Sequence, residues 1–437
     1  MLAASSTDAR EIEFFIENRL GGDSNVFRRA DETANSDLDP KAGGVWEVSP
    51  RVTLRDQQDE LEYDFRYQPT YERFFAIEDG GDDNGVSGLD HTAAGDFVWR
   101  VSPVTSIGGT GRFSRQRRLR EGFFDLGAVP DPPLVQTDNE YVQRARGELF
   151  FNRAFTPALS VQGTYTFDDF DVSQQQQGDS RLHSVSGGAY YSISSQLRLG
   201  ASATYRDRAT KASFDPDPTN SGTPETDIRE TRSTTRTVDF SVSAEYAISP
   251  HSTLSVAVGP SFFDTRDENS LGRVSYNTDD SIFAAVTARR VFRRGRAELS
   301  YTRSEGGGGG AAAATSILDS IVGEVSYRAT KRWLLLARTA WTHRASIASD
   351  AFLGRDVRTD TVSAYTSAQR RVTENFSIIA SVQYSWSRLD DFRPPQLLVP
   401  PNPPDPGILL PASSSRTTAE TIQGFISLRY TFDPYVF

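Results

Sequence analysis

The sequence of 437 residues lacks cysteine and has no long apolar run. Without cysteine the chain has no disulfide and no thiolate chemistry, which is compatible with an oxidising compartment. Its apolar pieces are short, such as "WLLLA", so a transmembrane helix of about 20 apolar residues is excluded. A membrane is not excluded, because a barrel wall presents only every second side chain to lipid, and its mean hydropathy, here −0.47, stays low.

Lysine is scarce as well. Only Lys41, Lys211 and Lys331 are lysines, so 47 − 3 leaves 44 arginines among the 47 basic residues. The 47 basic residues and 58 acidic residues give a net charge of −11. This charge argues against nucleic acid as a partner, because binding to phosphates requires a basic face. Arginine suits fixed ion pairs and the planar recognition of anions, although a GC-rich coding bias would also produce the excess.

The N-terminal letters "MLAASSTDAR" lack the basic region and the apolar core of a signal peptide. We therefore expect a mature chain whose export signal was removed or replaced by Met. We predict a short periplasmic segment over residues 1–9 and one transmembrane β-barrel domain over 10–437, with no plug, periplasmic repeat array or assembly domain.

Segments with an apolar side chain at every second position recur along the chain. Clear examples are "NFSIIASVQYSWSR" at 375–388, "LRLGASATYR" at 197–206 and "LEYDFRYQPTY" at 61–71. This period predicts strands, each with the roughly 9–11 residues that a tilted strand needs to cross a bilayer. The predicted strands are 10–20, 44–55, 60–73, 92–102, 105–117, 140–155, 158–170, 181–193, 196–208, 229–248, 252–264, 280–292, 295–304, 315–328, 331–345, 357–372, 375–389 and 416–432.

The connections between these strands alternate between short and long. Short ones include "DQQDE", "SPVT", "TPA" and "RRG", and long polar ones include 21–43, 118–139, 265–279 and 390–415. This alternation predicts an all-β fold, a transmembrane antiparallel barrel of 18 strands with short periplasmic turns and long extracellular loops. Because hydrocarbon tolerates no open sheet edge, the first strand must pair with the last.

Aromatic residues fit the same membrane interpretation. The five tryptophans lie near predicted strand ends, where amphipathic rings meet the membrane interface: Trp46, Trp99, Trp333, Trp341 and Trp386. We therefore expect a multi-pass barrel in the bacterial outer membrane, in contact with outer-membrane lipid and lipopolysaccharide.

Two stretches resemble known outer-membrane proteins. The ending "YVF", with Tyr435 and Phe437, resembles the aromatic signal that the barrel assembly machinery recognises, although Asp433 and Pro434 interrupt the alternation before it. The stretch "GGDSNVFRRADETANSDLDPKAGGVWEVSPRVTL" (21–54) is similar to the opening of a family of outer-membrane β-barrel porins associated with exopolysaccharide-export loci. The matching letters are Asp23, Asn25, Val26 and Phe27, followed by Val48, Ser49 and Pro50. The resemblance implies a barrel in an export context, with polysaccharide-export components as partners.

If the apolar face meets lipid, the alternate residues line the pore. Candidate pore-lining residues are Arg112, Arg144, Arg146, Arg198, Arg206, Arg208, Arg338, Arg371, Glu62, Asp64 and Asp96. In one interpretation these charges pair across strands and only keep the interior polar. In the other, the first six arginines form a ladder that lowers the barrier for anionic solutes such as uronate-bearing glycans.

Other motifs carry weaker predictions. The loop "EDGGDDNG" (78–85) offers oxygen ligands but not EF-hand spacing, and the glycine run 306–310 lacks the context of a phosphate-binding loop. The proline-rich segment 393–411 either constricts the pore or caps its rim. Neither the four histidines nor the serine of "GDSN" forms a catalytic set in sequence, so we expect no enzyme activity, no metal and no cofactor.

The leading hypothesis is a passive channel for anionic exopolysaccharide. A general or small-solute diffusion porin is the alternative, and a non-conducting barrel that binds a partner through its loops is the second alternative.

Overall fold

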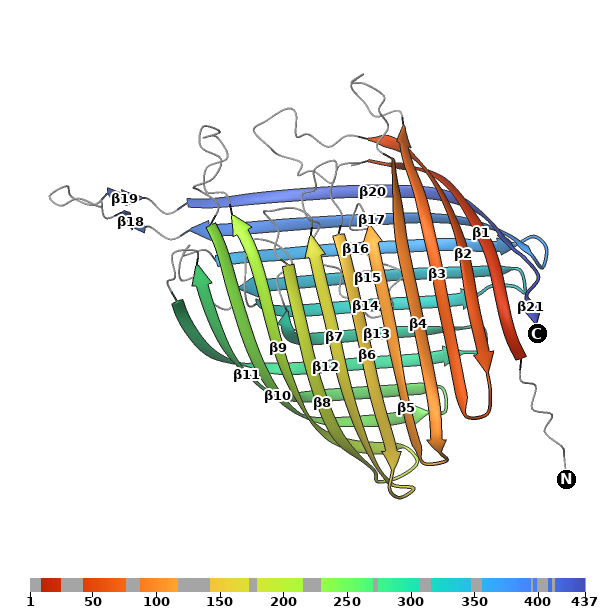
Figure 1. Ribbon diagram of the computed structural model, residues 1–437, viewed down its shortest axis with the longest axis horizontal. Coiled ribbons are helices and arrows are strands. Elements are labelled where there is room, and N and C mark those ends of the chain that lie inside the picture. Colours follow the sequence, from red (N-terminus) through yellow and green to blue (C-terminus); the bar gives the residue numbers. More distant parts are fainter. Residues whose placement is uncertain are drawn as a thin grey trace.

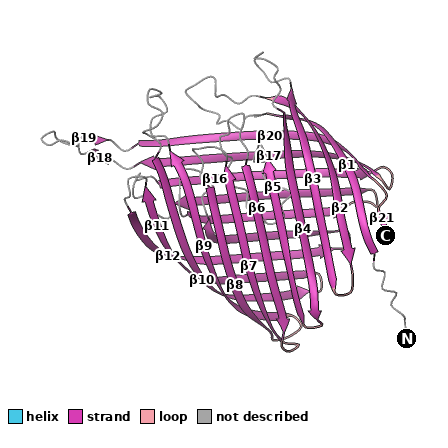
Figure 2. Ribbon diagram, in the orientation of Figure 1, coloured by secondary structure: helices cyan, strands magenta, loops and turns pink. Residues whose placement is uncertain are grey.

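The computed structural model describes residues 9–24, 42–75, 87–116, 142–172, 179–214, 229–269, 274–306, 316–346, 356–393, 396–398, 408–410 and 413–436. All regular elements in these ranges are strands (Figure 2). No helix in the described part of the chain is long and apolar enough to cross a membrane. The domain prediction for residues 1–9 concerns mainly residues outside the described ranges and stays a prediction.

The described strands form one closed antiparallel barrel (Figure 1). Each strand pairs with its neighbour in sequence, and β1 closes the sheet on β20 from Phe15↔Thr431 to Asp23↔Gln423. Counted over the described residues, 18 strands make the wall, as predicted. They are β1 (Ala9–Asp23), β2 (Gly43–Gln57), β3 (Leu61–Phe75), β4 (Ser87–Ser102), β5 (Thr105–Gln116), β6 (Val142–Ala154), β7 (Leu159–Val172), β8 (Asp179–Ser192), β9 (Leu197–Phe214), β10 (Arg229–Ser249), β11 (Ser252–Asn269), β12 (Val274–Phe292), β13 (Gly295–Gly306), β14 (Ser316–Arg328), β15 (Trp333–Ser346), β16 (Asp356–Arg371), β17 (Phe376–Arg393) and β20 (Ser413–Thr431).

The strands are strongly tilted. In Figure 1, β2 to β9 form the near wall and β13 to β17 the far wall, and the two sets cross at a large angle. A closed barrel requires such a tilt, typically about 35–45° from the barrel axis. Rows of hydrogen-bonded neighbours therefore climb around the wall as they pass from strand to strand.

The wall inverts the usual distribution of burial. Val242 and Ile426 are 62% and 61% exposed, whereas Thr237 and Ser363 are fully buried. Along each strand the exposed apolar side chains occupy one face and the polar ones the other, which is the two-sided period of a lipid-facing barrel. The chain is thus a multi-pass β-barrel of the outer membrane, with its apolar face outward and its polar face around the lumen.

The strands continue past the hydrocarbon on the long-loop side. Beyond Trp341 the outward side chains turn polar, and His343 Nδ1 lies 2.8 Å from Asp360 Oδ1 on the neighbouring strand. Trp341 and Trp386 therefore mark the membrane boundary, but they lie inside their strands, which end at Ser346 and Arg393. The prediction that the tryptophans lie near strand ends is wrong for Trp386, because β17 continues to Arg393 beyond the apolar part of the strand.

The same extension corrects two loop predictions. The predicted loop 265–279 is mostly strand, because β11 runs to Asn269 and β12 begins at Val274. His91, which lies outside the predicted strand 92–102, is in β4. These segments lack apolar alternation because both of their faces meet water, and hydropathy therefore does not reveal that they are strands.

The C-terminus extends the closing seam. After the break at Asp433 and Pro434, β21 (Tyr435–Val436) pairs with β1 through Ile12↔Tyr435, on the side of the short turns. Tyr435 is exposed at this rim. Phe437, the last residue of the predicted assembly signal, lies outside the described residues, and recognition by the assembly machinery stays a prediction.

A small hairpin forms within the proline-rich segment. β18 (Gln396–Leu398) pairs with β19 (Ile408–Leu410), and Figure 1 shows both beyond the loop-side ends of β17 and β20. For these residues the structure favours the rim over the pore. The acidic loop 78–85 and most of the glycine run 306–310 lie outside the described residues.

The two faces of the wall should respond differently to an added charge. Val258 points outward and lies six residues from the periplasmic end of β11. With a rise of about 3.4 Å per residue and a strand tilt of about 40°, it lies about 15 Å above that end. Val258→Arg should therefore lower the unfolding free energy by about 2–4 kcal/mol. Its matched control, Ala257→Arg, places the charge in the lumen and should have a much smaller effect. Urea unfolding in lipid vesicles measures both, and equal losses would contradict the assignment of faces.

Candidate functional site

The inner wall carries the predicted pore-lining residues. The register places all eleven on the polar face of their strands, opposite the exposed apolar side chains. Their part in conduction stays a prediction, and the structure adds how they are arranged relative to one another.

Three arginines form one inclined row across β3 to β6, which we call the arginine row: Arg66, Arg112 and Arg146. Arg66 and Arg112 both lie opposite Ala94, and Arg112 lies directly opposite Arg146. Two like charges in directly opposite positions destabilise a sheet, so this arrangement needs a compensating field.

An acidic row runs parallel to the arginine row, two residues away along each strand or about 6.8 Å. It consists of Asp64, Asp96 and Glu148, with Asp64 directly opposite Asp96. Arg66 Nε lies 2.5 Å from Asp64 Oδ1 and Arg66 Nη2 lies 3.9 Å from Asp96 Oδ1, so the two rows are joined at β3 and β4. The side chains of Arg66 and Asp96 are 48% and 54% exposed, so the joined rows face lumenal water.

The other members of the predicted ladder do not join this row. Arg144 donates two hydrogen bonds to Asp168, at 3.0 and 2.7 Å, and Arg206 Nη1 lies 2.8 Å from a carboxylate oxygen of the buried Asp239. For these two arginines the ion-pair interpretation holds. The six arginines do not form one continuous row, because β7 and β8 lie between β6 and β9, and their effect on anions stays a prediction.

The remaining pore-lining candidates either form local contacts or are placed by the strand register. Arg198 donates to Ser160 Oγ at 2.9 Å and lies over the ring of Tyr190. Glu62 accepts a hydrogen bond from Arg100 at 2.7 Å, near the periplasmic turn. The register sets Arg208 between Leu182 and Thr235, Arg338 between Glu324 and Tyr365, and Arg371 opposite Ser377 at the periplasmic end.

The closing seam contains a polar network that sequence reasoning mostly missed. Arg429 Nε donates to Glu17 Oε2 at 3.0 Å, and Arg19 Nη1 donates to Glu47 Oε2 at 3.0 Å. The inward Phe15 lies between two guanidinium groups, Arg51 at 4.4 Å and Arg429 at 5.1 Å. The alternation of Glu11, Glu13, Glu17 and Arg19 was the available signal, since these charges share one face of β1.

The histidines in strands lie on the outer face. His91 Nδ1 is 2.9 Å from the hydroxyl of Tyr67, and His183 makes the same contact with Tyr165. In the part of the chain that the structure describes, no group of three or more His, Cys, Asp or Glu residues could hold a metal ion. The predicted absence of enzyme activity stays a prediction.

The fold and the two-faced wall define an outer-membrane β-barrel protein. The sequence matches no family model and no curated protein. Its structure is similar to that of the FrpB iron transporter of Neisseria meningitidis, apoprotein form, with 8% identity over 96% of this chain and 81% of that chain and a TM-score of 0.43. It is also similar to the unliganded ferric citrate transporter FecA, with 10% identity over 96% and 79% and a TM-score of 0.42. The ferric-catecholate import receptor Fiu of E. coli K12 is 9% identical over 96% and 81%, with a TM-score of 0.42.

The seam pair should contribute measurably to stability. The side chains of Glu17 and Arg429 are 13% and 32% exposed, so water screens their interaction weakly. A double-mutant cycle with Glu17→Gln and Arg429→Gln should give a coupling of about 1–3 kcal/mol in unfolding experiments. The matched control is the more exposed pair Glu62 and Arg100, for which the coupling should stay below about 1 kcal/mol. Equal couplings would argue against a special role of the seam.

Proposed function

We propose that this barrel is a passive channel that conducts anionic polar solutes across the outer membrane, acidic polysaccharide among them. The observation that carries the proposal is the arginine row, in which Arg112 and Arg146 occupy opposite positions on the lumenal face. Guanidinium groups recognise carboxylates by paired hydrogen bonds, and a row of them offers a moving anion several equivalent partners.

The acidic row keeps these contacts weak. Because Asp64 and Asp96 neutralise part of the charge of Arg66, an anion at the row meets a moderate field instead of a deep well. Conduction requires this balance, since a solute must enter favourably and also leave. The strand number supports an aqueous lumen, because barrels of 16–18 strands are wide enough for a water-filled channel.

Polysaccharide fits the row better than a small ion does. The arginine row extends over three strand intervals of about 4.8 Å, or about 14 Å in total, so successive carboxylates of one chain can contact successive guanidinium groups. The family resemblance of residues 21–54 supports the same solute class.

Ion selectivity tests the proposal. In planar bilayers under a salt gradient, the reversal potential should show anion preference for the native protein. Arg112→Gln with Arg146→Gln should lower the anion-to-cation permeability ratio about two- to tenfold, because the row loses its like-charged pair. The matched control is Arg181→Gln, an exposed arginine on the outer face, which should leave the ratio unchanged. Absence of any open-channel current, or cation preference in the native protein, would contradict the proposal.

Oligosaccharide block tests the solute class. Oligouronates of increasing length should interrupt the current for longer as more carboxylates reach the arginine row, whereas neutral oligosaccharides of the same lengths should not. Block that is equal for charged and neutral sugars would favour a general diffusion porin.

A further inference from the structure

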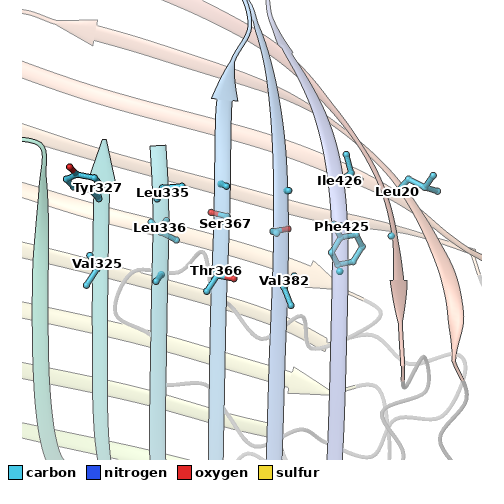
Figure 3. Close-up of a pocket in the computed structure, with 16 residues that line it drawn as sticks. Leu20, Val325, Tyr327, Leu335, Leu336, Thr366, Ser367, Val382, Phe425 and Ile426 are labelled. Carbon is cyan, nitrogen blue, oxygen red and sulfur yellow. The ribbon is translucent and has the colours of Figure 1, made fainter. Parts of the chain in front are cut away.

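The outer face of the wall contains a groove. It has a volume of about 980 Å³ and crosses six neighbouring strands, β14 to β17, β20 and β1 (Figure 3). Most of its lining residues belong to the apolar outward face. Small side chains lie along its middle: Ala337, Thr366, Ala368, Ala380 and Gly424. A Cβ built at Gly424 would meet no atom within 4 Å, so the groove is open there.

The groove follows the inclined rows of the barrel. One row joins Tyr327, Leu335, Ala368, Ala380, Ile426 and Leu20, each directly opposite the next. Its lower end is at the periplasmic rim, because Tyr327 is one residue from the end of β14. Five strand intervals of about 4.8 Å make about 24 Å, and at a tilt of about 40° the row climbs about 15 Å. That height is half of the roughly 30 Å hydrocarbon core, the depth of one leaflet.

Cations gather at the lower end of the groove. Six exposed basic residues lie on the outward face or in the turns between β12 and β16, and we call them the basic rim: Arg290, Arg293, Arg294, Lys331, Arg332 and Arg370. Arg370 lies over the ring of Trp333 at 5.7 Å, directly below Leu335 and Ala368 of the groove. Arg294 Nη1 donates to the Ala329 carbonyl at 3.1 Å and so links two of the turns. By contrast, the β2–β3 turn carries Asp59 and Glu60.

We propose that the groove and the basic rim together bind an anionic glycerophospholipid of the periplasmic leaflet. The phosphate contacts Lys331, Arg332 and Arg370, and one acyl chain lies along the row of small side chains. Charge complementarity and the match between groove height and leaflet depth both point to this occupant. A second copy of the chain fits less well, because a symmetric contact would bring two basic rims together.

Lipid retention tests the proposal. The native protein is purified in detergent, mixed with phosphatidylglycerol or phosphatidylcholine of identical acyl chains, and examined by native mass spectrometry. It should retain phosphatidylglycerol preferentially. The triple variant Lys331→Gln, Arg332→Gln, Arg370→Gln should bind phosphatidylglycerol about 10- to 100-fold more weakly, since each cation near a membrane surface attracts anionic lipid. The matched control is Arg153→Gln, which lies over Phe155 at 5.1 Å on another part of the rim and should bind as the native protein does.

A second variant tests the acyl chain. Ala368→Leu with Ala380→Leu fills the groove and leaves every charge in place, so it should weaken binding of both lipids. Heat-modifiable migration in gels verifies that each variant is a folded barrel, and the rim variant alone suffices should the groove variant fail to fold. Equal retention of the two lipids by the native protein would overturn the proposal. So would native binding by a folded groove variant, which would leave an acidic periplasmic protein as the partner of the rim.

Discussion

The structure depends on one constraint, that every backbone amide and carbonyl inside hydrocarbon needs a partner within the protein. The ladder between β1 and β20 meets this constraint at the seam, and β21 continues it toward the periplasm. The ladder between β2 and β3 is interrupted between the pairs Val48↔Tyr71 and Val52↔Tyr67, an interval that contains Pro50 and Pro69, which have no amide hydrogen. Lumenal side chains cross this interval instead, through Ser49 with Thr70 at 2.9 Å and Arg51 with Gln68 at 2.7 Å. The polar network beside the seam therefore lies next to an interruption of the backbone ladder.

The wall is a single sheet between lipid and water, so apolar and polar side chains have to alternate along each strand. This alternation explains how much of the fold was predictable from the sequence. Apolar alternation located all eighteen wall strands, because lipid imposes the period wherever it touches the chain. It did not locate their loop-side ends. In β11, Asp264 and Glu268 lie on the same outward face as Val256 and Val258. They lie above the membrane, where backbone pairing maintains the strand without lipid contact. The hydropathy pattern indicates whether a side chain faces lipid or water, and it does not indicate whether the backbone is paired. The loop-side ends of the strands could therefore be located only in the structure.

The candidate site was predictable by face and not by partner. Alternation within each strand put Arg112, Arg144 and Arg146 on the inner wall. Which carboxylate each one meets depends on the stagger between strands, which is set by closure of the whole barrel. Asp168 lies directly opposite Arg146, yet it accepts its hydrogen bonds from Arg144, one row above. The like-charged pair of Arg112 and Arg146 arises from the same stagger, and no local pattern in "GTGRFSRQ" or "VQRARGEL" indicates it.

Tilt links the inner and the outer features of the wall. A barrel of 18 strands closes only if its strands tilt, so that rows of neighbouring residues are inclined. Closure also brings together residues far apart in sequence, such as Leu20 and Ile426. On the inner wall the same inclination sets the arginine row obliquely across the lumen. Under the proposed function, a solute would meet its charges one after another. On the outer wall it carries the groove from the periplasmic interface toward the middle of the membrane, along the path that an acyl chain takes from its headgroup. The inclination of both the arginine row and the groove therefore follows from the geometry that closes the sheet. The sequence supplies the arginines on the inner face of the wall and the small residues on the outer face.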